Sequence, residues 1–105
     1  MGIKDKRSIQ EKGLSAQLMV EKLNSLGGIS FKNMFGGQGI FKDDKMFCIV
    51  DSAGNYFFKV NDANKSDFEK EGSVKHSRMP YFSVPQNVFD DYDMLITWAK
   101  KCINN

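Results

Sequence analysis

The sequence predicts a two-layer α+β domain, in which helices pack on an antiparallel sheet of about five strands in the order α-β-β-β-β-α-β-α. Apolar residues recur at helical spacing near both ends of the chain, and four short β-rich runs lie between these ends. Each connection between those runs is two or three residues long. A parallel crossover needs a dozen or more residues, so the runs form antiparallel hairpins.

The first helix is predicted from an apolar face that ends near Gly27, a residue suited to a helix C-terminus. Ser8 and Glu11 can form a capping box, but Gly13 costs about 1 kcal/mol relative to alanine and favours a start near Leu14. The face consists of Ala16, Met19, Val20, Leu23 and Leu26. We expect one domain over residues 1–105, with residues 1–8 and 104–105 frayed.

The central part of the chain is predicted to be a four-stranded meander. Turn residues separate the strands, as in Asp43-Asp44, whose side chains can hydrogen-bond the local backbone. The predicted strands are Ile29–Phe35, Gly39–Lys42, Lys45–Asp51 and Asn55–Val60.

A second helix is predicted from an Asp62 N-cap to about Glu71, with Phe68 as its main apolar anchor. Residues 78–84 form the fifth predicted strand. Because Pro80 lacks an amide donor, this strand should lie at a sheet edge or begin after the proline.

The last helix is predicted to open at Asp90 or Asp91, with lysines in its final turns that suit the helix dipole. Its apolar stripe should pack on the sheet, with Trp98 as the anchor. The stripe consists of Leu95, Trp98, Ala99 and Cys102.

Both faces of the two middle strands carry large apolar residues. Regular alternation puts Phe47, Ile49 and Phe57 on one face, and a second set on the other. This second set is Met46, Cys48, Val50, Tyr56, Phe58 and Val60. Either the helices and chain ends wrap both faces, or part of one face is an exposed apolar patch for a partner or for self-association. The strand at Pro80 offers a second route to self-association, through its edge.

The bulk composition is that of a folded protein with no marked charge. Of 105 residues, 41% are hydrophobic, and 15 basic against 13 acidic residues give a net charge of +2. This charge does not support direct binding to nucleic acid. We find no signal peptide and no segment that could span a membrane, so we expect a cytoplasmic protein.

The sequence offers little for catalysis, a metal or a cofactor. Cys48 and Cys102 lack CxxC spacing, and His76 is the one histidine, in a charged run where a solvated loop position is expected. We therefore expect reduced structural thiols, no metal site, no cofactor and no enzymatic activity.

The glycine-rich stretch Met34–Phe41 is the most unusual local pattern. A phosphate-binding loop would require a Gly-Lys-Ser/Thr ending and a following helix, and both are missing. A strained hairpin with a bulge accounts for the glycines better, and we expect Gly36, Gly37 or Gly39 in a conformation closed to other residues.

Several blocks together resemble the TfoX/Sxy N-terminal domain. The stretch Met34–Phe41 is similar to the signature of that family. The blocks Met46-Phe47, Tyr56–Val60 and Met79–Pro85 are similar to those that follow it, in the same order. The resemblance extends over residues 14–103.

This resemblance implies a two-layer α+β fold and kinship with bacterial regulators of competence and DNA uptake that act on transcription. Two departures stand out. The family commonly has a basic pair before Met34, where this chain has Lys32 and Asn33. The chain also ends at Asn105 without the C-terminal domain of full-length members, so we expect a stand-alone domain.

The leading hypothesis is a non-enzymatic regulatory module that binds a protein partner, with a homodimer as a further possibility. The alternative is a sensor of a small ligand or nucleotide that uses the glycine loop. The candidate binding residues are Lys32, Met34, Phe35, Gly36, Gly37, Gly39, Lys59 and Tyr81.

Overall fold

A computed structural model describes residues 13–34 and 36–103 and confirms the α+β class with a five-stranded antiparallel sheet. The capping pair Ser8 and Glu11, the predicted frayed ends and Phe35 lie outside the described residues. An N-terminal helix over residues 13–22 precedes the other elements. These are η1 (Asn24–Leu26, a 3-10 helix), β1 (Ile29–Met34), β2 (Gly37–Lys42), β3 (Lys45–Val50), β4 (Tyr56–Lys59), α2 (Lys65–Lys70), β5 (Tyr81–Ser83), α3 (Gln86–Phe89) and α4 (Tyr92–Ile103).

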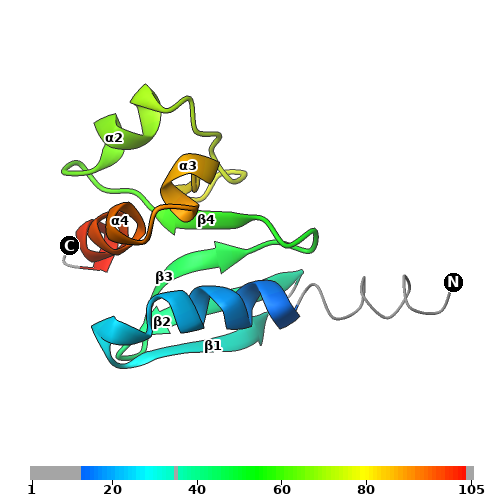
Figure 1. Ribbon diagram of the computed structural model, residues 1–105. Helices are drawn as coiled ribbons and strands as arrows, with labels where there is room; N and C mark the ends of the chain where they lie inside the picture. The colour runs from blue at the N-terminus through cyan, green and yellow to red at the C-terminus, as the bar shows by residue number, and fades with distance from the viewer. Residues whose placement is uncertain (1–12, 35, 104–105) are drawn as a thin grey trace, which may run out of the picture.

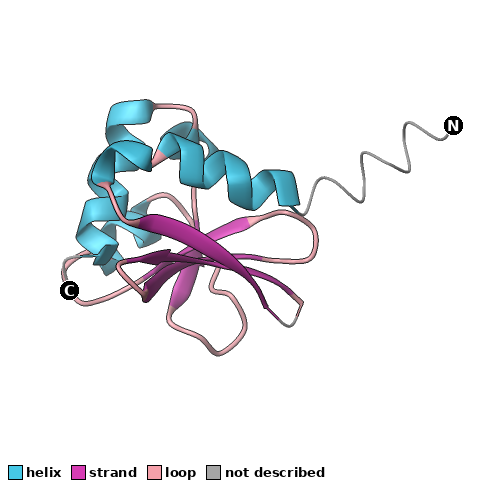
Figure 2. Ribbon diagram, turned by 90° about the horizontal axis from the view of Figure 1, so that it is seen from below, coloured by secondary structure: helices cyan, strands magenta, loops and turns pink. Residues whose placement is uncertain are grey.

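The strands follow one another across the sheet in chain order, β1-β2-β3-β4-β5, and every neighbouring pair is antiparallel. The described helices gather on one side of the sheet (Figure 2). The N-terminal helix lies over β1 and β2, and α4 lies beside β3 and β4 (Figure 1). The other side of the sheet carries no described helix, so the described helices do not wrap both faces.

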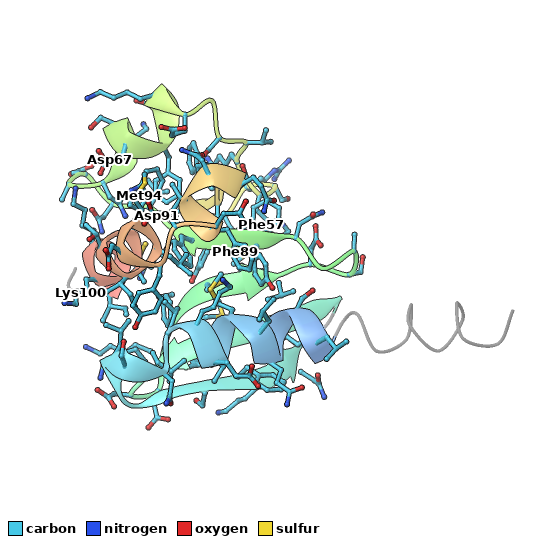
Figure 3. All side chains as sticks on the ribbon, viewed as in Figure 1. Phe57, Asp67, Phe89, Asp91, Met94 and Lys100 are labelled. Carbon is cyan, nitrogen blue, oxygen red and sulfur yellow. The ribbon has the colours of Figure 1, made fainter. Side chains whose placement is uncertain are left out.

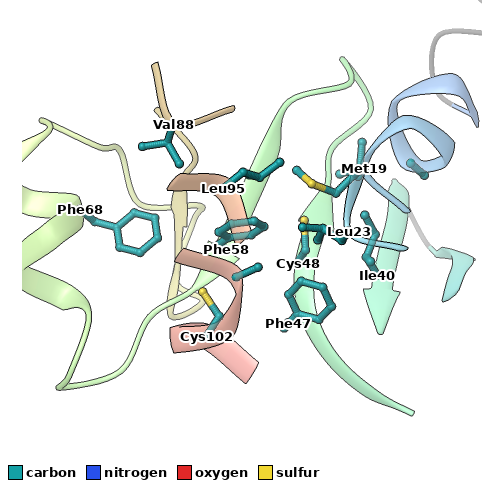
Figure 4. Packing of buried hydrophobic residues seen from close by; sticks show 13 residues of the cluster. Met19, Leu23, Ile40, Phe47, Cys48, Phe58, Phe68, Val88, Leu95 and Cys102 are labelled. Carbon is teal, nitrogen blue, oxygen red and sulfur yellow. The ribbon is translucent and has the colours of Figure 1, made fainter. Parts of the chain in front are cut away.

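The hydrophobic core lies between this sheet and the helices (Figure 4). Ile40, Cys48 and Phe58 rise from the three central strands and are fully buried. Met19 from the N-terminal helix and Leu95 from α4 cover them and are also fully buried. The two ends of the described chain therefore close the same core.

A β-bulge in β3 changes which side chains enter this core. Ile40 pairs with Cys48 and the next residue, Phe41, pairs with Met46, so Phe47 is the extra residue opposite β2. Phe47 turns into the core beside Phe58, with ring centroids 6.0 Å apart. The prediction that Phe47 lies on the face of Ile49 was wrong, because the bulge interrupts the alternation and sends Met46 to that face instead.

The turn between β2 and β3 was predicted correctly, and the start of β2 was not. Asp43 and Asp44 both have positive φ, as a type I′ turn requires. β2 begins at Gly37 and not at Gly39, so Gly37 and Gln38, which were assigned to the loop, lie inside the strand. The turn between β1 and β2 is correspondingly shorter than predicted.

Helix α2 begins later than predicted. Asn61, and not Asp62, organises the turn, because its side-chain oxygen accepts bonds from the Ala63 and Asn64 amides. Asn64 occupies the N-cap position and is buried. The exposed Asp62 makes no such bond among the described residues.

The C-terminal part of the fold contains one helix that the sequence did not predict. Pro85 precedes the short helix α3, and proline at a helix start is the one signal in the sequence that marks it. Asp91 does open α4, as one of the two predicted alternatives, and it lies close to Met94 at the start of that helix (Figure 3). Its side-chain oxygen accepts a bond from the Met94 amide. β5 starts after Pro80, and it is the outermost strand on its side.

Candidate functional site

The outer face is our name for the side of the sheet that lies opposite the helices. Strand register and alternation place its side chains, because Ile40, Cys48 and Phe58 mark the core side and their neighbours along each strand point away. The outer face comprises Ser30, Lys32, Met34, Gly37, Gly39, Phe41, Met46, Ile49, Phe57, Lys59, Tyr81 and Ser83.

Gly39 forms a hollow at the centre of β1, β2 and β3 that two methionines fill. A Cβ atom at this position would collide with the sulfur of Met34 and would lie 2.7 Å from that of Met46. Phe41 borders the same hollow, since its Cε1 would lie 3.3 Å from that Cβ. The glycine therefore allows thioethers from β1 and β3 to converge over the strand between them.

A cation lies beside these apolar groups. The Lys32 Nζ is 5.2 Å from the centre of the Phe41 ring, within the range of a cation–π contact. Met34 next to it is 45% exposed. The part of the outer face near Met34 and Phe41 thus presents exposed apolar surface, with the positive charge of Lys32 beside it.

The other end of the outer face is covered by the loop before β5. The His76 ring packs on Phe57, with centroids 4.5 Å apart, and His76 is half-buried. His76 lies in a loop, as expected, but it is only partly solvated, because Phe57 supplies an apolar surface for the ring. Between His76, Met79 and the turn at Gly36 lies a small pocket of about 120 Å³.

Tyr81 lies on the outer face but is only 4% exposed. Its hydroxyl donates to the carbonyl oxygen of Met46 at 3.4 Å, beside the bulge. Burial raises the pKa of Tyr81 to about 12, so its hydroxyl stays protonated. Its geometry is that of a structural support for β3 and not that of an accessible binding group.

The structure brings most of the predicted site residues to one surface. Lys32, Met34, Gly37, Gly39, Lys59 and Tyr81 all lie on the outer face. Gly36 lies in the turn beside it, with a φ of 85°. The sequence reasoning missed Phe41, Met46, His76 and Met79. The bulge places Met46 there, and no residue type in β3 signals that bulge.

The two thiols contribute no reactive group to this surface. Cys48 and Cys102 are free cysteines inside the core (Figure 4). Burial raises the pKa of the Cys102 thiol to about 12, against a smaller lowering by the Asn64 amide. Burial and the neighbouring Cys102 also raise the pKa of Cys48. Protonated, enclosed thiols are poor nucleophiles and poor metal ligands.

Within residues 13–34 and 36–103, no three His, Cys, Asp or Glu side chains gather in a way that could hold a metal ion. Over the same residues, each helix is too short or too polar for a membrane-spanning segment.

Comparison with known proteins gives one family match. The TfoX N-terminal domain matches residues 21–105, which include the whole sheet and the helices that follow it. No curated protein matches the chain. The TfoX N-terminal domain is associated with the regulation of competence and DNA transformation. The match covers more than half of the chain, and we conclude that this protein belongs to the TfoX N-terminal domain family.

Proposed function

We propose that this domain is a non-enzymatic regulatory module of the bacterial cytoplasm, which acts on transcription by binding a protein partner through the outer face. The observation that carries the proposal is apolar surface, exposed at Met34 and partly exposed at Phe41, Met46 and Ile49, on a sheet face that no described helix covers. Exposed apolar patches on small soluble domains commonly mark interaction sites.

The side chains of the outer face suit adaptable protein recognition. Met34 on the outer face is 45% exposed, and Met79 in the loop beside that face is 39% exposed. Methionine is flexible and polarisable, and it adjusts to differently shaped apolar partners. The pleat beneath these side chains is rigid, because Gly39 and Ile49 are paired within the central strands. Flexible methionine side chains on a fixed strand backbone favour the binding of a protein surface over the binding of one defined small molecule.

Two further features support binding over catalysis. The thiols have raised pKa values inside the core. His76 is half-buried against the Phe57 ring, with no carboxylate among its described contacts to orient it as a base. A catalytic histidine is usually held by such a partner.

The pocket near Gly36 counts against the alternative of a nucleotide sensor. Its volume of about 120 Å³ is well below the roughly 300–1,000 Å³ of typical ligand sites. Asp51 in its lining carries a negative charge that disfavours a phosphate.

The proposal is tested by site-specific photo-crosslinking in the native host. A photoreactive amino acid replaces Met34 on the outer face, and the control replaces Leu18 on the outward side of the N-terminal helix, which is 42% exposed. We expect the Met34 probe to yield an adduct with a protein of the transcription apparatus that the Leu18 probe does not form. Met34→Glu should then lower transformation frequency, whereas Leu18→Glu should not. Equal adducts and equal frequencies for the two sites would refute the assignment to the outer face.

A further inference from the structure

We infer that the free edge of β1 pairs antiparallel with β1 of a second copy of this chain, around a two-fold axis at Phe31. This goes beyond the proposed function, because it uses the edge of the sheet and leaves the outer face free. The backbone groups of β1 that point away from the sheet are the ones available for this pairing.

Hydrogen bonding between β1 and β2 determines those groups. The Asp43 amide donates to the Gly28 carbonyl at 3.0 Å, which makes this pair a hydrogen-bonded one in the register of the two strands. Hydrogen-bonded pairs alternate along an antiparallel ladder, so Ser30, Lys32 and Met34 bond to β2. Ile29, Phe31 and Asn33 therefore present their amides and carbonyls to the free edge.

The two edges of the sheet are protected very differently. At the β5 edge, Lys75 forms a bridge with Phe82, and the Ser83 amide donates to the Val74 carbonyl at 2.8 Å. Pro80 and the three-residue length of β5 limit that edge further. This makes the Pro80 strand a poor route to self-association.

The β1 edge has six continuous residues with no proline. No bulge interrupts its pairing with β2. Phe31 on this edge is 38% exposed. A strand of this kind is a template for another strand, and among the described residues neither a proline, a bulge nor a bridging segment protects it.

The spacing of the outward groups selects a second copy of the same strand as the partner. In an antiparallel pair centred on Phe31, Phe31 faces its own copy and Ile29 faces Asn33, so all three outward residues on each strand are paired. Lys32, the one charged residue of β1, faces Ser30 of the other copy. No two like charges are directly opposite each other, and the two phenylalanines form a cross-strand aromatic pair.

The size of this contact indicates a weak dimer. A six-residue strand spans about 20 Å, and the contact falls below the roughly 1,200 Å² buried by stable complexes. The pairing joins the two sheets side by side, with both outer faces on the same side. A dimer would therefore present the proposed binding surface twice.

Sedimentation equilibrium from micromolar to millimolar protein, with Asn33→Pro and Asn33→Ala, tests the inference. We expect the parent to rise from 11.9 kDa toward twice that mass. Proline removes an outward amide without breaking a bond to β2, so Asn33→Pro should weaken association at least tenfold. Asn33→Ala loses the same side chain but keeps the amide, and it should associate like the parent.

Crosslinking tests the register separately. Phe31→Cys should form a disulfide-linked dimer under mild oxidation, because hydrogen-bonded partners lie about 5.5 Å apart between Cα atoms. Ser30→Cys does not face its own copy and should crosslink much less. Because Cys48 and Cys102 are buried, they should not compete.

A parent that stays at 11.9 kDa throughout would overturn the inference, as would a dimer unaffected by Asn33→Pro or an equal yield from the two cysteine variants. Circular dichroism shows whether each variant is folded. The photo-crosslinking test compares the Met34 and Leu18 probes by their adducts with a different protein. A failure of the proposed function is therefore distinguishable from a failure of self-association through β1.

Discussion

The indole of Trp98 lies edge-on to the ring of Phe68, with ring centroids 4.7 Å apart and ring planes inclined by 68°. Phe68 is the buried residue of α2, and Trp98 in α4 is half-buried. Trp98 was expected to anchor α4 on the sheet, but its aromatic contact is with α2. Leu95, Ala99 and Cys102 on the same helix are the buried residues that join the core cluster.

This geometry predicts that Trp98→Ala loosens α2 more than the sheet. We expect a loss of about 2 kcal/mol in the free energy of unfolding, below the range for a fully buried tryptophan, because Trp98 is only half-buried. Hydrogen exchange should show lost protection in residues 65–70. Leu95→Ala is the control and should cost about 3 kcal/mol with the loss spread over the sheet. Unchanged exchange in α2 would contradict the role given to the ring pair.

Substitution of each of the three glycines near the β1–β2 turn by alanine should lower the free energy of unfolding by a different amount. Gly36 has a φ of 85° but open space around it, so Gly36→Ala should cost about 1 kcal/mol. In Gly37→Ala the new Cβ would collide with the backbone oxygen of Val50, which cannot easily move, and we expect the largest loss. Gly39→Ala displaces two flexible methionine ends and should rank between them.

Denaturant midpoints of the three variants test this order. Gly13→Ala is a matched control, because Gly13 lies in the N-terminal helix, lacks a positive φ and has open space around its Cβ position. It should stabilise the protein by up to about 1 kcal/mol. Equal midpoints for all four variants would remove the steric account of the glycine stretch.

The buried thiols predict a loss of stability in alkaline solution. The unfolded chain releases these protons near the ordinary pKa of 9.0, whereas in the folded protein burial raises the pKa of Cys102 to about 12. The folded state therefore holds more protons between these values, so stability is full below pH 9 and falls as the pH rises toward 12.

Urea unfolding at intervals from pH 8 to pH 11 measures this loss. Each retained proton contributes a slope of about 1.4 kcal/mol per pH unit. Cys102→Ala should lower the slope by about one proton relative to the parent. The same slope in both proteins would show that the Cys102 thiol titrates alike in the folded and unfolded states.

The buried amide of Asn64 should tolerate replacement by a carboxyl group poorly. Its amide nitrogen donates to the Lys59 carbonyl at 3.1 Å, and its side-chain oxygen accepts from the Asn61 amide at 2.7 Å. Asn64→Asp keeps the shape but loses the donor and brings a charge into the interior. We expect a loss of about 3 kcal/mol at neutral pH, from the cost of an unsatisfied buried group.

The sign of the pH dependence provides the check. Burial should raise the folded pKa of the new carboxyl above the unfolded value of about 3.9, so the penalty should shrink as the pH falls toward 4, when the protonated group can donate again. The exposed Asn87 is the control position, and Asn87→Asp should change stability by less than about 0.5 kcal/mol. A penalty independent of pH would argue against a buried carboxylate.

Features fixed by local chemistry were predictable from the sequence, and features fixed by packing were not. The turn at Asp43 and Asp44 and the start of α4 at Asp91 depend on a few adjacent residues, and both were predicted. The bulge at Phe47 depends on how the core fills, and the apolar sequence of β3 is compatible with a regular strand.

The residues of the candidate site likewise fall into a group that the sequence predicted and a group that it did not. The glycine motif pointed to Gly37 and Gly39, because a missing side chain is visible in the sequence. Met46 reached the outer face only through the bulge, and His76 only through the fold of the loop before β5. Neither placement could follow from residue spacing, since both depend on contacts between strands or between a strand and a distant loop.

The unbroken order of the strands has a consequence for folding kinetics. Each strand pairs with the strand next to it in the chain, so much of the sheet can form by successive hairpin closures of low contact order. The core is sealed only when Met19 and Leu95, from opposite ends of the described chain, meet over β2, β3 and β4. The sheet can therefore form early, and docking of the first and last helices should limit the rate at which the native state appears.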